Sequence, residues 1–193
     1  MDKKTKEQKL IKGCQAGKGK YQQMLYELYY GKMFSVCLRY SRSREEAKDI
    51  LHEGYMKVFA GIGQYKGEGS LEGWIRRIMV NTAINHYHKN KKLKDTFSIE
   101  EEYDEVAEND HLTEENVIQQ MAYDDLLQII RTLPPAYQTV FSLYAIEGYN
   151  HREIAEMLQI SEGTSKSNLA KARKKLQKQV QVLLSQKAQF QNV

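Results

Sequence analysis

Polar and aromatic side chains suited to binding single-stranded DNA gather along residues 71–92. They are Trp74, Arg76, Arg77, Asn81, Asn85, His88 and Lys89. Four of them, from Arg77 to His88, follow one another at steps of four, four and three, which places them on one helix face. Amides can pair with base edges, cations can hold phosphates, and aromatic rings can stack unpaired bases. A core position is favoured for Trp74, whereas basic surroundings favour DNA contact over plain solvation for Asn81 and Asn85.

A second set lies near the C-terminal end, where two helix starts follow each other closely. Asn150 and Glu153 have the spacing of a capping box, and Ser161 can cap the next helix. A short helix, a tight turn and a longer basic helix form a helix-turn-helix, whose second helix enters the major groove. The residues expected to contact bases or phosphates are Thr164, Lys166, Ser167, Lys171, Arg173 and Lys174. A plain helical hairpin with a solvated lysine face is the alternative.

Helical periodicity extends over most of the chain, because apolar residues recur at steps of three and four. A first stripe runs from Met24 through Leu28 to Tyr40, and a second helix follows the S-x-x-E capping pattern at Ser43. Glycines over 61–69 predict a loop before the helix that carries the first set.

The C-terminal part of the chain has the same helical pattern. Helices are expected from near 117 to 133, from 137 to 146, from 151 to 158, and from 162 into the 180s. No alternating run predicts a strand, so the expected fold is all-α, with two small helical domains.

Charge divides the chain into three parts. Residues 1–94 hold 20 Lys and Arg against 9 Asp and Glu, residues 95–125 hold 12 acids and no Lys or Arg, and residues 126–193 hold 9 bases against 4 acids. Two basic parts around an acidic one predict two polyanion-binding domains joined by a segment that repels nucleic acid. The expected units are a domain at 1–94, an acidic flexible linker at 95–116, a helix-turn-helix domain at 117–184 and a tail at 185–193.

The composition excludes several classes of protein. The Lys-rich N-terminus lacks the apolar core of a signal peptide, and no window approaches the ~18 apolar residues of a membrane span. We therefore expect a cytoplasmic protein without membrane insertion, in which two cysteines are too few for a disulfide scaffold. Catalysis is disfavoured because His86 and His88 lie on different helix faces without a carboxylate cluster or cysteine pair nearby. No cofactor, metal or small-molecule substrate is expected.

The chain resembles the bacterial RNA polymerase sigma factors of the extracytoplasmic-function (ECF) subfamily of the sigma-seventy family. In the N-terminal part the likeness lies in EEAKDILHEGYMKVF and GSLEGWIRRIMVNTAINHYHK, and in the C-terminal part in LPPAYQTVFSLYAIEGYNHREIAEMLQISEGTSKSNLAKARKKL. These segments fall within residues 21–180 in the family's order, and two ordered matches are more specific than one. The resemblance implies that the chain binds core RNA polymerase, directs it to specific promoters and promotes DNA melting.

The resemblance also implies roles for individual residues. The second helix would grip the polymerase clamp helices through Asp49, His52, Glu53 and Met56. The C-terminal domain would contact the polymerase flap and read the duplex minus-thirty-five element with Lys166, Ser167 and Lys171, while Asn81 would receive an extruded, single-stranded base of the minus-ten element. The acidic linker would thread toward the active centre along the path of RNA, and an anti-sigma factor would mask both domains.

Departures from the family pattern affect details of these roles. His52 stands where Gln is usual, and Gln159 stands in the turn where Gly is usual. Lys166, Asn168 and Lys171 replace frequent arginines, and lysine lacks the bidentate fork. A stand-alone helix-turn-helix regulator that binds duplex DNA without polymerase is the main alternative. A helical adaptor for acidic proteins would explain the charge but not the helix-turn-helix, and the charged face of the second helix also fits plain solvation.

Overall fold

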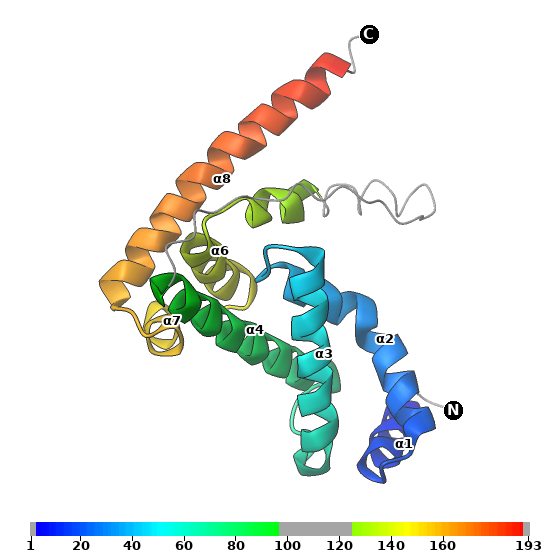
Figure 1. The fold of residues 1–193 in the computed structure, drawn as a ribbon. Helices are drawn as coiled ribbons and strands as arrows, with labels where there is room; N and C mark the ends of the chain where they lie inside the picture. The colour runs from blue at the N-terminus through cyan, green and yellow to red at the C-terminus, as the bar shows by residue number, and fades with distance from the viewer. Residues whose placement is uncertain (1–2, 97–124, 191–193) are drawn as a thin grey trace.

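The structure is a computed structural model that describes residues 3–96 and 125–190, with side chains over 5–92 and 125–182. The N-terminal half (3–96) holds α1 (Lys3–Gln15), α2 (Gly19–Leu38), α3 (Arg44–Gly61), the 3₁₀ turn η1 (Ile62–Gln64) and α4 (Leu71–Thr96). The C-terminal half (125–190) begins with a helical stretch over 125–131 and continues with α6 (Pro135–Phe141), the π-helical turn η2 (Ser142–Ile146), α7 (His151–Leu158) and α8 (Glu162–Phe190). Neither half contains a strand within these residues, which confirms the all-α prediction (Figure 1).

The predicted domain boundaries can be compared with the structure only in part. The helix expected to close the first domain continues to Thr96, two residues into the predicted linker. The rest of that linker, the expected start of a helix near Val117 and the last residues of the tail lie outside the described residues.

Side-chain caps start α3 and α7 where the sequence predicts them. Ser43 accepts a hydrogen bond from the backbone N–H of Glu46 at 3.1 Å. The Glu46 carboxylate accepts from the N–H of Arg42 at 2.7 Å, one residue before the position that a full capping box would use. At α7, by contrast, Asn150 and Glu153 form both bonds of the box.

The core of the N-terminal half lies where α2, α3 and α4 pack against one another. Its largest fully buried side chains include Leu25, Met33, Ile50, Leu71, Ile75 and Met79. Gly54 allows the close approach of α3 to α4, because a Cβ at this position would overlap the Met79 sulfur and force that side chain to move. The sequence analysis missed α1, which packs on α2 and contributes Leu10 and Cys14 to the core. The spacing of these two apolar residues, one helical turn apart, was the available signal.

The predicted apolar stripe of α2 is wrong at two positions. Met24 is 46% exposed and Leu28 is 60% exposed, although the periodicity placed both in the core. Partly buried Tyr26 of the same helix instead packs against α3, with its ring centroid 4.6 Å from that of buried Tyr55. The helix carries two adjacent apolar stripes, and α3 and α4 cover only one of them.

The C-terminal half packs α6 and α7 against the first part of α8, and α8 then extends beyond the other helices (Figure 1). Leu169, Ala172 and Leu176 of the predicted α8 stripe are buried, and Val180 is partly buried. The side chain of Leu183, the last predicted member, lies outside the described set.

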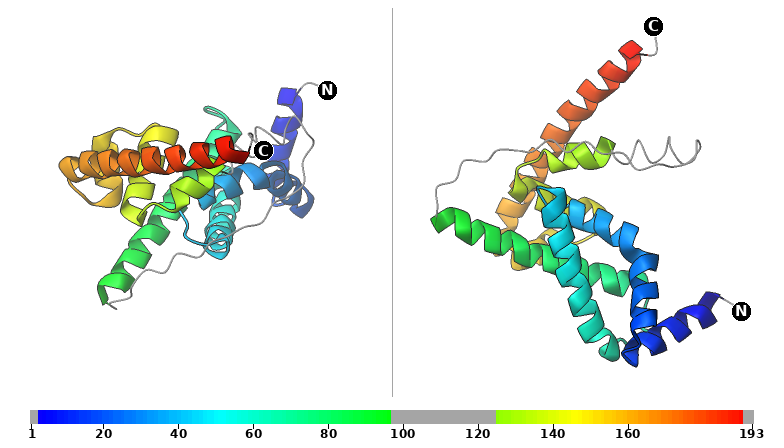
Figure 2. Two further views of the ribbon diagram at one scale, coloured as in Figure 1. Left: turned by 90° about the horizontal axis from the view of Figure 1, so that it is seen from above. Right: turned by 45° about the vertical axis from the view of Figure 1, so that its right-hand side comes forward.

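The two halves pack against each other through one continuous apolar cluster. Val140, Leu143, Ile154, Leu158 and Leu169 are buried in the same cluster as the core residues of α2, α3 and α4. Helix α7 lies beside α4, as the views in Figures 1 and 2 show. The two small domains expected from the sequence are thus in direct contact, a point that the sequence left open.

Candidate nucleic-acid interface

Helix α4 exposes one continuous polar face. Arg77, Asn81, Asn85 and Lys89 follow one another at steps of four and are all exposed, so they form what we call the α4 polar face. Ser70 starts the helix by accepting a bond from the N–H of Gly73 at 3.0 Å. Amide groups between two cations suit contact with both bases and phosphates.

Trp74 lies at the start of the α4 polar face but packs inward. Its ring centroid is 5.2 Å from that of Tyr65, in a tilted arrangement, and the side chain is partly buried. This geometry supports the core interpretation of Trp74 over a role in stacking DNA bases.

Arg76, expected to hold DNA phosphate, instead binds a carboxylate from the other half. Its Nε and Nη2 donate to the two oxygens of Glu147 at 2.6 and 3.0 Å, and Arg39 Nη2 donates to Glu147 Oε1 at 3.1 Å. The Arg39 and Glu147 side chains are 7% and 6% exposed, against 36% for Arg76. We call these three side chains the Glu147 ion cluster. The hydrogen bonds to Glu147 raise the pKa of Arg76, so its guanidinium stays charged.

His88 is also bonded to the C-terminal half. Its Nε2 lies 2.9 Å from the backbone oxygen of Met157 in α7, and this ring nitrogen is the donor because a carbonyl only accepts. Arg131 and Gln138 donate to the backbone oxygens of Arg42 and Ser41, at 2.9 and 3.3 Å. Of the side chains predicted to contact melted DNA, Arg76 and His88 therefore lie in the interface between the halves.

Helix α8 exposes the second polar face in full. All six predicted contact residues are exposed, and together they form the α8 polar face: Thr164, Lys166, Ser167, Lys171, Arg173 and Lys174. The Lys171 ammonium lies 5.9 Å from the Tyr137 ring centroid, and the Arg173 guanidinium lies 5.7 Å from that of Tyr144. Both cations therefore lie against aromatic rings of the C-terminal half, whereas Lys166 and Ser167 are exposed to solvent.

The turn between α7 and α8 sets the direction of α8 through one left-handed residue and several hydrogen bonds. Gln159 has φ 54° and ψ 50°, so a non-glycine residue does adopt the left-handed conformation that the sequence analysis anticipated. Ser161 then accepts from the N–H of Thr164 at 3.0 Å. Buried Ser165 is held by His151, whose Nδ1 lies 2.9 Å from the serine Oγ. These contacts fix the first turn of α8, which a major-groove reader presents to bases.

The predicted polymerase-binding residues line the exposed side of α3. Asp49, His52, Glu53 and Met56 are all exposed, Met56 by 61%. Glu53 is held from two sides, by Lys57 at 2.6 Å and by His86 at 2.7 Å. These two hydrogen bonds lower the pKa of the Glu53 carboxyl. The face therefore combines charge with an uncovered apolar side chain, a mixture found at protein–protein interfaces.

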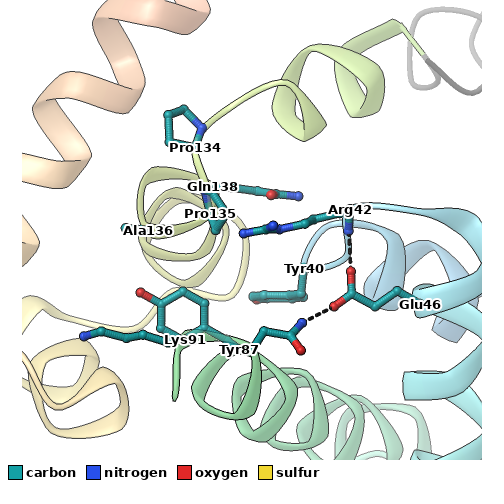
Figure 3. Close-up of a pocket in the computed structure, with 10 residues that line it drawn as sticks. Tyr40, Arg42, Glu46, Tyr87, Lys91, Pro134, Pro135, Ala136 and Gln138 are labelled. Carbon is teal, nitrogen blue, oxygen red and sulfur yellow. Dashed lines mark hydrogen bonds between the residues drawn. The ribbon is translucent and has the colours of Figure 1, made fainter. Parts of the chain in front are cut away.

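A cavity of about 280 Å³ lies at the seam between the halves (Figure 3). Its walls come from the α2–α3 connection, the end of α4 and the start of α6, and they are formed by Tyr40, Arg42, Glu46, Tyr87, Asn90, Lys91, Pro134, Pro135, Ala136 and Gln138. Glu46 spans its edge, accepting from Arg42 on one oxygen and from Asn90 on the other. The described residues include no group of His, Cys, Asp or Glu that could hold a metal ion, and their helices include none long and apolar enough to cross a membrane.

Sequence reasoning missed Arg39 and Glu147, two charged residues with buried side chains that join the halves. They are 108 positions apart, and no local sequence pattern pairs them. The available signal was weak: Glu147 is one of only four acids in residues 126–193, and it precedes a glycine in a turn.

Two known protein families match the chain, one for each half. The family described as "Sigma-70 region 2" matches residues 25–93, and the family described as "Sigma-70, region 4" matches residues 123–176. The α4 polar face lies within the first match. The second contains the helix-turn-helix and the whole α8 polar face.

Individual relatives match nearly the whole chain. The RNA polymerase sigma-H factor of Pseudomonas aeruginosa is 28% identical over 92% of this chain and 95% of its own length. The ECF RNA polymerase sigma-E factor of Haemophilus influenzae is 27% identical, over 95% and 100% respectively. The fold is similar to that of the sigma factor RpoE from Bartonella quintana, solved in complex with the anti-sigma factor NepR, with a TM-score of 0.53 at 17% identity over 83% of this chain and 96% of that one.

Proposed function

Because the chain belongs to the ECF subfamily of the sigma-70 family, we propose that it binds core RNA polymerase and directs it to specific promoters. One observation carries the proposal: regions 2 and 4 occur in order, and each presents an exposed polar face suited to nucleic acid. Two DNA-reading units in one chain fit a protein that contacts two promoter elements at once.

The two polar faces divide the promoter between them in this proposal. The α4 polar face, with Asn81 and Asn85, takes the melted minus-ten element, where amides pair with exposed base edges. The α8 polar face takes the duplex minus-thirty-five element, where Ser167 contacts bases and the lysines hold phosphates. The exposure of both sets supports this division.

Polymerase contact is assigned to the exposed side of α3 and to the C-terminal half. Asp49, His52, Glu53 and Met56 would bind the clamp helices, and the helix-turn-helix half would meet the flap. The acidic segment over 95–116 would pass along the path of RNA, where its carboxylates repel nucleic acid.

The protein would act in the cytoplasm by assembling a complex, without a catalytic step of its own. An anti-sigma factor is a further expected partner. The fold is shared with a sigma factor solved in such a complex, and masking of both DNA-binding halves would regulate the protein.

In vitro transcription with core polymerase and a promoter library tests the proposal. We expect promoter-specific transcripts only when the protein is present, together with co-purification of core polymerase at low salt. The matched control is the chain with Asp49→Ala and Met56→Ala, which should fold normally and lose polymerase binding. Duplex binding without transcription or polymerase contact would instead identify a stand-alone helix-turn-helix regulator.

A further inference from the structure

We propose that Arg39 and Arg76 form an anion-binding surface that Glu147 occupies in the free protein, and that promoter DNA phosphate replaces Glu147 when the halves separate. The inference rests on the proposed function, which supplies promoter DNA as the competitor. In this view the contact between the halves is a reversible latch that covers one flank of the α4 polar face.

The geometry of the Glu147 ion cluster is that of anion recognition. Arg76 binds both carboxylate oxygens through two different nitrogens, at 2.6 and 3.0 Å. A guanidinium makes the same pair of parallel bonds to a phosphate, so one fork serves either partner. Arg76 directly precedes Arg77 of the α4 polar face, so the anion-binding surface lies about 100° around the helix from Arg77, on the flank of that face.

Glu147 is presented by a turn with little conformational freedom. The N–H of Glu147 donates to the oxygen of Ser142 at 3.0 Å, and that of Tyr149 donates to the oxygen of Leu143 at 3.0 Å. Between them Gly148 has φ +81°, a conformation that favours glycine. The backbone at Glu147 is therefore fixed to the C-terminal half, and the carboxylate moves away from the arginines with that half when the halves separate.

Loss of Glu147 should open the latch, because Arg39 and Glu147 lie almost entirely out of solvent. Removing one partner of a buried pair leaves an uncompensated charge, which is costlier than the loss of a surface pair. The nearby Tyr40 hydroxyl weakens the closed state, because it is buried without a hydrogen-bond partner among the described residues. Separation of the halves would return this hydroxyl to water. The closed state is therefore stabilised by the Glu147 ion cluster and destabilised by the unbonded hydroxyl.

The closed arrangement is too short to engage both promoter elements. Elements centred roughly 25 base pairs apart are separated by about 85 Å, at ~3.4 Å per base pair. In the closed structure α7 contacts α4, and three residues separate the end of α7 from the start of α8. The N-terminal turns of α8 therefore lie close to α4, and the halves must separate before both polar faces can bind one promoter.

The test measures the separation of the halves in the free, full-length protein, without polymerase or DNA. Dyes on cysteines introduced at exposed Lys48 and Lys175 report the distance by energy transfer. Native Cys14 and Cys37 are buried, and burial raises the pKa of the Cys37 thiol to about 12, so it does not compete for the dye. The test variant is Glu147→Gln. The matched control is Glu156→Gln, which removes a 70% exposed carboxylate from the same half.

Glu147→Gln is expected to lower the closing equilibrium constant by roughly 100-fold or more, and Glu156→Gln to leave it within about twofold. The open variant should also bind a single-stranded minus-ten oligonucleotide more tightly than the wild type. An unchanged distance in Glu147→Gln, or an equal change in Glu156→Gln, overturns the latch. A changed distance with unchanged oligonucleotide affinity overturns the competition with DNA.

A second variant guards against misfolding of the first. Arg76→Lys keeps the charge but loses the fork, at a side chain that is 36% exposed, and it should open the halves partially. Helical content by circular dichroism confirms that each variant is folded. Because the distance needs no polymerase, an unchanged distance contradicts the latch whatever transcription shows. Absence of transcription with a normal response to Glu147→Gln contradicts the proposed function and leaves the latch in place.

Discussion

Helices α4 and α8 both carry candidate DNA-binding side chains, but they differ in what the rest of the molecule leaves uncovered. On α8, all six predicted contact residues are exposed, because α6 and α7 pack on the opposite side. On α4, Arg76 and His88 are bonded to the C-terminal half, while the Asn81 and Asn85 side chains face solvent. Some side chains of α4, which lies between the two halves, therefore have two candidate partners, the C-terminal half and DNA.

The apolar contacts show the same difference. Leu143 and Ile154 belong to a cluster that runs through both halves. Leu176, with Ala172 and Leu133, belongs to a smaller cluster formed within the C-terminal half alone. Each half should therefore respond differently when one cluster or the other is weakened.

The largest expected effect is a loss of stability that distinguishes the shared apolar cluster from the cluster within the C-terminal half. Leu143→Ala should lower the free energy of unfolding by about 2–5 kcal/mol, because the site is fully buried. Unfolding is followed by the fluorescence of Trp74, the only tryptophan, in the N-terminal half. Leu176→Ala is the matched control, which should increase amide exchange in α8 and leave the Trp74 transition in place. A Trp74 transition unchanged by Leu143→Ala would mean that the halves unfold independently.

The next effect concerns the α4 polar face. Asn81→Ala should reduce promoter opening by about 5- to 150-fold, since an amide paired with a base edge contributes ~1–3 kcal/mol. Opening is measured by permanganate reactivity of unpaired thymines. Duplex binding, measured in parallel, should change little. Equal losses in the two assays would show that Asn81 has no special role in the melted state.

The α8 polar face is tested by salt dependence. Lys166→Ala and Lys171→Ala should each reduce the slope of log affinity against log salt by about one, because each removes a phosphate contact. The assay uses a duplex with the minus-thirty-five element. Lys178→Ala, at an exposed position further along α8, is the control. A slope that does not change would assign both lysines to solvent.

The smallest effect compares two carboxylates that bind α4, buried Glu147 and half-exposed Glu53. Lys57 and His86 lower the pKa of Glu53 below its unfolded value, so its stabilising effect is present at neutral pH and is lost as pH falls through the folded-state pKa. The contribution should stay below ~1 kcal/mol because the side chain is 46% exposed and salt screens it. Unfolding of wild type and Glu53→Gln should therefore differ slightly at pH 7 and converge once the pH falls below the folded-state pKa of Glu53. A difference that persists at low pH would contradict the ionic origin.

The predictions that succeeded concern residues close together in the chain. The capping patterns at Ser43, Asn150 and Ser161 start helices where expected, since caps depend on residues three or four positions apart. The stripe through Met24 and Leu28 failed, because periodicity detects an apolar face but does not say which neighbour covers it. The first helix was missed because its apolar residues are few among lysines.

The sequence by itself determined the all-α fold, the order of the two halves and most residues of both polar faces, because periodicity and capping are local. Only the tertiary structure decided that the halves share a core and that Glu147 binds Arg39 and Arg76. Those partners are 108 and 71 positions apart, and their pairing depends on how the helices pack. The sequence therefore indicated where DNA could bind, and the packing decided which of those side chains the free protein already uses.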